Sequence, residues 1–131
     1  MHSSVETVRS FYNALRGGDV QGVIAVLDDK VAWTEAEYFP YYSGTWRGPQ
    51  AVVENLLVPL SRDWDGFQAT PSEFIEQGER VISLGTYSGT YKKSGRQLTV
   101  AFAHAWVVRK GKIVSFDMFT DTAKVLEALK P

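Results

Sequence analysis

The sequence predicts an α+β fold in which helices pack on one face of a curved sheet. Two observations predict it. Apolar residues at helical spacing fill the first part of the chain around one strand-like segment, and four β-rich runs separated by turn residues follow. The 131 residues contain no linker, repeat or low-complexity tract. We therefore expect one domain over 1–131, able to bury about two thirds of the surface that the unfolded chain exposes.

Capping residues mark the first two helices. Ser3 and Glu6 form a capping box ahead of apolar residues at helical spacing, so a helix begins there. Gly17-Gly18 ends this helix. Asp19 then stands where a side-chain oxygen can cap a second, short helix.

The middle of the chain predicts a turn, a strand, a covering segment and a third helix. Asp28-Asp29-Lys30 is polar and indicates a turn before a strand over Val31–Glu35. The segment 37–48 is rich in aromatic residues, but its proline and glycines argue against regular structure, which predicts a flap over a cavity. Pro49 suits the first turn of a helix that ends near Trp64.

The remainder predicts antiparallel strands joined by hairpins and a closing helix. Turn residues at 77–79, 93–95 and 110–111 separate the runs. Asp121 is positioned to cap the last helix. The expected strands are Gln68–Glu76, Arg80–Tyr91, Gln97–Lys110 and Lys112–Thr120.

Composition excludes several function classes. The 14 basic and 15 acidic residues give a net charge of -1, which lacks the basic patch that nucleic-acid binding needs. The absence of cysteine excludes disulfides and thiol chemistry and agrees with the reducing cytoplasm, where we expect the protein. No apolar run approaches the ~18 residues of a membrane span, so we expect no membrane association.

Motifs for metals, nucleotides and covalent catalysis are absent from the sequence. One interior histidine stands without a second ligand at metal-binding spacing, and the glycines do not match a phosphate-binding loop. No serine lies in a Gly-x-Ser-x-Gly elbow. We therefore expect neither a metal nor another cofactor.

Six short motifs carry a resemblance to a known superfamily over essentially the whole chain. They are Phe-Tyr-Asn-Ala-Leu-Arg-Gly-Gly-Asp at 11–19, Leu-Asp-Asp at 27–29, Gly-Thr-Trp-Arg-Gly-Pro at 44–49, Phe-Ala-His-Ala-Trp at 102–106, Arg-Lys-Gly-Lys-Ile-Val at 109–114 and Asp-Thr at 121–122. With them the chain resembles the nuclear transport factor 2-like (NTF2-like) superfamily, in its SnoaL-like and ketosteroid-isomerase-like branch. The resemblance implies a cone-shaped, cystatin-like fold, in which three to four helices cover the concave face of a curved mixed sheet around a pocket. It also implies a homodimer.

The resemblance assigns candidate residues one at a time. Glu35 falls where steroid isomerases hold their carboxylate base, and Asp121 matches an acid or base of SnoaL-type cyclases. Phe11 and Ala103 fall at the two oxyanion-hole positions, and neither side chain can donate a hydrogen bond. A steroid isomerase proper is therefore disfavoured, unless Tyr12 or His104 beside those positions supplies a donor.

The residues around Glu35 make it the strongest catalytic candidate. Side chains two residues apart on a strand share a face, so Trp33 and Glu35 point to the same side. In an apolar cavity the pKa of this carboxyl would rise, which suits general acid/base work near neutral pH. The alternatives are that both side chains face a dimer partner, or that Glu35 pairs with Arg47.

His104 and Asp121 are the other catalytic candidates. On the expected strand, His104 shares a face with Phe102 and Trp106, and the alanines between them occupy the other face. The sequence leaves open which face is concave, and therefore whether His104 shuttles protons or is structural. Asp121 serves as acid or base, as a helix cap, or as both.

These observations predict cofactor-free general acid/base chemistry, of an isomerase, cyclase or lyase-like kind, on a flat hydrophobic small molecule. The alternative is a non-catalytic module that binds a hydrophobic ligand or assembles with partners. The sequence leaves open whether the protein is an enzyme. The residues expected to contact the ligand are Tyr12, Trp33, Tyr42, Trp46, Trp106, Phe116 and Met118.

Overall fold

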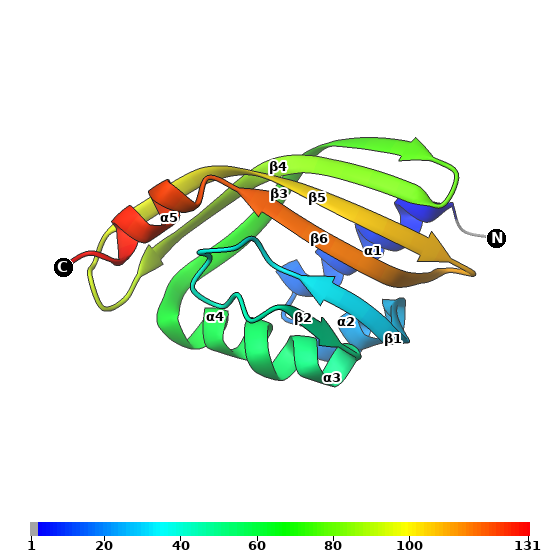
Figure 1. Cartoon of the computed structure of the whole chain (residues 1–131), viewed down its shortest axis with the longest axis horizontal. Coiled ribbons are helices and arrows are strands. Elements are labelled where there is room, and N and C mark those ends of the chain that lie inside the picture. The colour runs from blue at the N-terminus through cyan, green and yellow to red at the C-terminus, as the bar shows by residue number, and fades with distance from the viewer. Residues whose placement is uncertain (1–2) are drawn as a thin grey trace.

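The computed structural model describes residues 3–131, which form a curved mixed sheet with helices across its concave side (Figure 1). The sheet has the strand order β2-β1-β6-β5-β4-β3. This arrangement confirms the predicted α+β cone. The strands are β1 (Leu27–Thr34), β2 (Thr45–Arg47), β3 (Trp64–Gln77), β4 (Arg80–Tyr91), β5 (Gln97–Arg109) and β6 (Lys112–Thr120). The helices are α1 (Ser4–Arg16), α2 (Val20–Val26), α3 (Pro49–Val52), the π-helical turn η1 (Val53–Leu57), α4 (Val58–Asp63) and α5 (Thr122–Leu129).

The predicted caps begin the helices. The Ser3 side chain accepts a hydrogen bond from the backbone N–H of Glu6, and Asp19 accepts one from Gly22. Asp121 caps α5 through the N–H of Lys124. Since α3, η1 and α4 follow one another without a break, they form a single helical stretch from 49 to 63, as expected from Pro49.

Two details of the first strands differ from the prediction. The polar residues 28–30 form no separate turn, because β1 begins at Leu27 and pairs in parallel with β6 from there. The polar stretch is accommodated by a register irregularity between Leu27 and Ala32. Within the expected irregular flap, Thr45–Arg47 forms β2, because it pairs antiparallel with β1 and places Trp46 opposite Trp33.

The strands β3 to β6 form the predicted antiparallel run, with β3 starting four residues earlier than expected, directly after α4. Alternate burial along β5 identifies the concave face: Phe102, His104 and Trp106 are buried, whereas Ala101 is exposed. The aromatic face therefore turns toward the helices.

Gly85 on β4 makes this aromatic packing possible. A Cβ atom at this position would collide with the carbonyl oxygen of Thr70 and with the ring of Phe102. Without that Cβ, the Phe102 ring lies close over the strand and stacks on His104, with 3.9 Å between ring centroids and an interplanar angle of 12°. Gly85 therefore helps to position His104.

No helix within residues 3–131 is long and apolar enough to cross a membrane.

Candidate functional site

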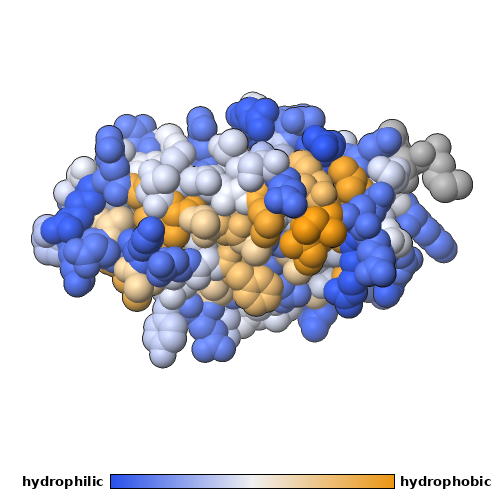
Figure 2. All heavy atoms as spheres, turned by 90° about the horizontal axis from the view of Figure 1, so that it is seen from above, coloured by the Kyte–Doolittle hydropathy of each residue, from blue (hydrophilic) through white to orange (hydrophobic). Residues whose placement is uncertain are grey.

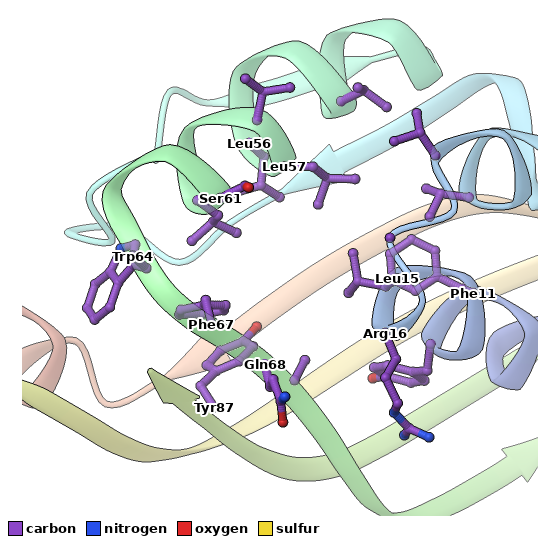
Figure 3. A pocket seen from close by; sticks show the side chains of 18 of the residues that line it. Phe11, Leu15, Arg16, Leu56, Leu57, Ser61, Trp64, Phe67, Gln68 and Tyr87 are labelled. Atoms are coloured by element: carbon purple, nitrogen blue, oxygen red, sulfur yellow. The ribbon is translucent and has the colours of Figure 1, made fainter. Parts of the chain in front are cut away.

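A cavity of about 750 Å³ lies between the concave face of the sheet and the helices. Such a volume suits a small organic ligand. Its wall is mostly apolar, and its polar groups come mainly from the sheet, from α1 and from the 49–63 helical stretch. Figure 3 shows the side chains that face one another across it: Phe11, Leu15 and Arg16 from α1, Leu56, Leu57 and Ser61 from the 49–63 helical stretch, and Phe67, Gln68 and Tyr87 from β3 and β4.

Glu35 follows the last residue of β1 and lies in the wall of this cavity. Its side chain is only 5% exposed, and its Oε2 accepts a hydrogen bond of 2.9 Å from Trp33 Nε1. Burial raises the pKa of Glu35 from 4.5 to about 8, against the smaller opposing effect of the Trp33 hydrogen bond. The carboxyl group is therefore mostly protonated at pH 7.

The second carboxyl oxygen of Glu35, Oε1, differs from Oε2 in its hydrogen bonding. Oε1 has no hydrogen-bond partner among residues 3–131, although every fully buried side-chain nitrogen or oxygen of those residues has one. Oε1 is therefore not fully buried, and Glu35 is one of the residues that line the cavity. Arg47, the alternative partner considered from the sequence, forms no ion pair with Glu35 and is exposed on β2.

His104 is held between two tyrosines. Its Nδ1 lies 2.5 Å from the hydroxyl of Tyr12 on α1, and its Nε2 lies 2.6 Å from the hydroxyl of Tyr87 on β4. Burial lowers the pKa of His104 well below 6.5, because the cavity wall disfavours the imidazolium. The ring is therefore neutral, with one N–H and one acceptor nitrogen.

The Tyr12 hydroxyl connects His104 to a deeper pair of side chains. It lies 2.6 Å from Oγ of Ser83, which accepts a hydrogen bond of 2.9 Å from Trp106 Nε1. The five side chains form a continuous buried chain in the order Trp106, Ser83, Tyr12, His104 and Tyr87. Burial raises the pKa of Tyr12 and of Tyr87, so all five side chains of this hydrogen-bonded network are uncharged.

The structure brings five of the predicted site residues together in the cavity wall and leaves the others outside. Tyr12, Trp33, Glu35, His104 and Phe116 line the cavity.

Trp106 and Met118 are buried in the core but do not line the cavity. The exposed Tyr42 and the half-buried Trp46 lie outside it, because the 37–48 segment runs toward the sheet edge and only Phe39 reaches the wall. Asp121 lies outside as well, at the start of α5, where it accepts a hydrogen bond from the Lys124 N–H.

Tyr87 and Ser83 are not among the residues that the sequence predicts for the site. Both lie on the concave face of β4, where Val81, Ser83 and Tyr87 are buried at alternate positions. Ser83 stands opposite His104 in the β4–β5 ladder. Strand alternation places Val81, Ser83 and Tyr87 on one face, but it does not say that this face is concave, and the register that brings these groups to His104 depends on the whole hairpin.

Among the described residues, no group of three or more histidine, aspartate or glutamate side chains is arranged to hold a metal ion.

A model of the SnoaL-like domain matches residues 8–116. The chain belongs to the SnoaL-like family. An NTF2-like protein from Burkholderia thailandensis is 35% identical to this SnoaL-like chain, with a TM-score of 0.96 over 100% of both chains. TerC, crystallised with polyporic acid, is 30% identical, with a TM-score of 0.86 over 95% of this chain and 96% of TerC.

A putative SnoaL-like polyketide cyclase from Jannaschia sp. CCS1 shares the fold at 17% identity, with a TM-score of 0.82 over 98% of this chain and 93% of that one. No protein of curated function matches the SnoaL-like chain. The comparisons confirm the predicted NTF2-like superfamily and its SnoaL-like branch.

Proposed function

We propose that this SnoaL-like protein binds a flat hydrophobic small molecule in the cavity and moves a proton on it by cofactor-free acid/base chemistry through Glu35. The observation that carries the proposal is a sheltered carboxyl group in the cavity lining, with one oxygen held by Trp33 and the other, Oε1, without a hydrogen-bond partner among the described residues. A carboxyl group of this kind can give or take a proton only at the oxygen that Trp33 does not hold.

The electrostatics of Glu35 support the same role. A pKa of about 8 lies near neutral pH, where a group can act efficiently both as acid and as base. On a ketone, ionised Glu35 would take a proton from the carbon next to the carbonyl, and the C–H electrons would form the C=C bond of an enolate. The protonated carboxyl would then return the proton to the same or a conjugated carbon.

The shape and lining of the cavity support the class of ligand. About 750 Å³ with mostly apolar walls accommodates a molecule of one to three rings. The rings of Trp33 and Phe116, stacked with 3.8 Å between centroids, offer a flat aromatic surface in the wall. The co-crystal of TerC with polyporic acid supports a small organic ligand for this chain as well.

Exchange of carbon-bound hydrogen tests the proposal. 1-Tetralone, a bicyclic aryl ketone, is incubated in D2O with the wild type, with Glu35→Gln and with Glu37→Gln, which changes an exposed carboxylate two residues further on. We expect exchange beside the carbonyl with the wild type and Glu37→Gln, and a loss of roughly 10²-fold or more with Glu35→Gln. Binding without exchange in any of the three proteins would favour the alternative, a non-catalytic binding module.

We propose that the outer face of the sheet is the interface of a homodimer. Cross-strand partners share a face, and two rows of such partners carry apolar side chains there: Ile75, Ile82 and Ala105 in one row, and Leu84, Ala103 and Phe119 in the other. Ile75 is 50% exposed and Phe119 is 58% exposed, and Figure 2 shows hydrophobic residues gathered on the face seen from above.

An isologous pairing would cover this patch on both copies at once. Sedimentation of the wild type should give twice the chain mass, and Phe119→Glu should give a folded monomer. A monomeric wild type would contradict the dimer and leave the role of Glu35 untouched.

A further inference from the structure

We propose that the buried hydrogen bonds from Trp106 to His104 fix the His104 ring as its Nε2–H tautomer. The Tyr87 hydroxyl then becomes a hydrogen-bond donor for a carbonyl or enolate oxygen of the ligand. The proposal rests on the ligand site of the proposed function. It deepens that function by naming the ligand group that the cavity recognises.

Trp106 fixes which group donates in the first of these hydrogen bonds. An indole N–H can only donate, so Ser83 Oγ accepts from Trp106 Nε1. Ser83 is fully buried, and the Tyr12 hydroxyl is its other side-chain partner among residues 3–131. The Ser83 hydroxyl hydrogen therefore has one acceptor within reach, which is the oxygen of Tyr12.

The same direction of hydrogen-bond donation continues through Tyr12 to His104. The Tyr12 oxygen receives the Ser83 hydrogen, and its own hydrogen then has His104 Nδ1 as its acceptor, 2.5 Å away. An accepting Nδ1 in a neutral ring places the single N–H on Nε2. That N–H donates to the Tyr87 oxygen, 2.6 Å away.

The reverse direction leaves a buried donor without an acceptor. If Tyr87 donated to Nε2, the Nδ1–H would donate to Tyr12. Either the Tyr12 or the Ser83 hydrogen would then lack an acceptor among the described residues, and both side chains are buried. Buried donors are nearly always satisfied, so this arrangement is disfavoured.

In the favoured direction, the Tyr87 hydroxyl hydrogen is the one that has no acceptor among the described residues. Its side chain lines the cavity and extends from β4 toward the space below the 49–63 helical stretch (Figure 3). A hydroxyl that already accepts from His104 can donate its own hydrogen to a ligand oxygen. The stacking of Phe102 on His104 holds the imidazole plane while it does so.

Tyr87 and Glu35 share the cavity, and a negative charge on Glu35 is near enough to raise the pKa of Tyr87. A ligand could therefore place its oxygen at Tyr87 and the neighbouring carbon at Oε1 of Glu35. The recognised class is a ring ketone, a quinone or the enolate derived from one. Tyr87 would be catalytic in this arrangement, whereas His104, Tyr12 and Ser83 would be positioning residues.

The tautomer is tested without any ligand. Long-range ¹H–¹⁵N correlation spectra of His2→Ala, which retains His104 as its one histidine, report which ring nitrogen carries hydrogen. We expect the Nε2–H pattern at neutral pH. An Nδ1–H pattern or an imidazolium would overturn the proposal, while the exchange test on Glu35 would stand on its own.

The donor is tested with a matched pair of ligands. 1-Tetralone and tetralin share a carbon skeleton, but tetralin has no oxygen. Tyr87→Phe should weaken tetralone binding by about five- to tenfold and leave tetralin binding unchanged. Tyr42→Phe, which removes a phenol outside the cavity, should change neither. Equal weakening of both ligands by Tyr87→Phe would mean that Tyr87 acts through packing, and would overturn the proposal.

Discussion

The indole N–H of Trp33 donates a 2.9 Å hydrogen bond to Oε2 of Glu35, two residues further along the chain. The two side chains share a face because residues alternate across a strand. This contact fixes one carboxyl oxygen, and the other has no hydrogen-bond partner among the described residues. A single hydrogen bond does not offset the cost of burying a charge, so the pKa of Glu35 stays raised at about 8.

Glu35→Gln should remove a loss of stability at alkaline pH. The pKa of Glu35 is about 8 in the folded chain against an ordinary 4.5, so between these values the folded state binds the additional proton. The free energy of unfolding therefore falls as pH rises from about 4.5 to 8. At about 1.4 kcal/mol per pH unit, this group costs on the order of 5 kcal/mol above pH 8.

Urea unfolding of the wild type and of Glu35→Gln at pH 6 and pH 9 measures this effect. The variant should gain stability over the wild type at pH 9, and Glu37→Gln serves as the control for an exposed carboxylate. An equal pH dependence in all three proteins would contradict the buried, protonated state of Glu35.

His104 should limit stability on the acid side. Its pKa is lowered well below 6.5 in the fold by burial, so below pH 6.5 the unfolded chain binds the additional proton. Stability is therefore fully present above pH 6.5 and is lost as pH falls through the folded pKa. The titratable groups that contact the ring, Tyr12 and Tyr87, stay neutral in this range and do not offset the loss.

His104→Gln keeps a polar side chain at this position but cannot take up a proton. Its free energy of unfolding should fall less between pH 6.5 and pH 4 than that of the wild type, when both are measured by urea unfolding. A steeper fall in the variant would show that the acid sensitivity arises elsewhere.

Local signals predicted much of this molecule, and long-range pairing decided the rest. Asp19 and Asp121 mark helix starts because a cap is read from a few adjacent residues. The shared face of Trp33 and Glu35 follows from strand alternation alone. The concave face of β5 and the contact between Tyr87 and His104 depend on the β4–β5 register and on the helices opposite, which no local window contains.

Trp33→Phe should raise the pKa of Glu35 above about 8. The Trp33 hydrogen bond favours the charged carboxylate, and its loss removes that support, whereas a phenyl ring can still stack on Phe116. The pH profile of ketone exchange should shift toward alkaline pH. Trp46→Phe, on the neighbouring strand but outside the cavity, should leave the profile where it is. A shift produced equally by both variants would contradict a direct effect of the indole N–H.

Gly85→Ala should destabilise the fold and loosen the His104 site. The added methyl group would collide with the Thr70 carbonyl oxygen and the Phe102 ring, so both must move or β4 must shift. Overpacking of this kind costs about 1 to 3 kcal/mol, measured as the free energy of unfolding. Gly17→Ala is the control, because its new Cβ would meet its nearest neighbour at an ordinary 3.5 Å. A His104 ring spectrum that stays unchanged in Gly85→Ala would show that Phe102 is not needed to hold the imidazole.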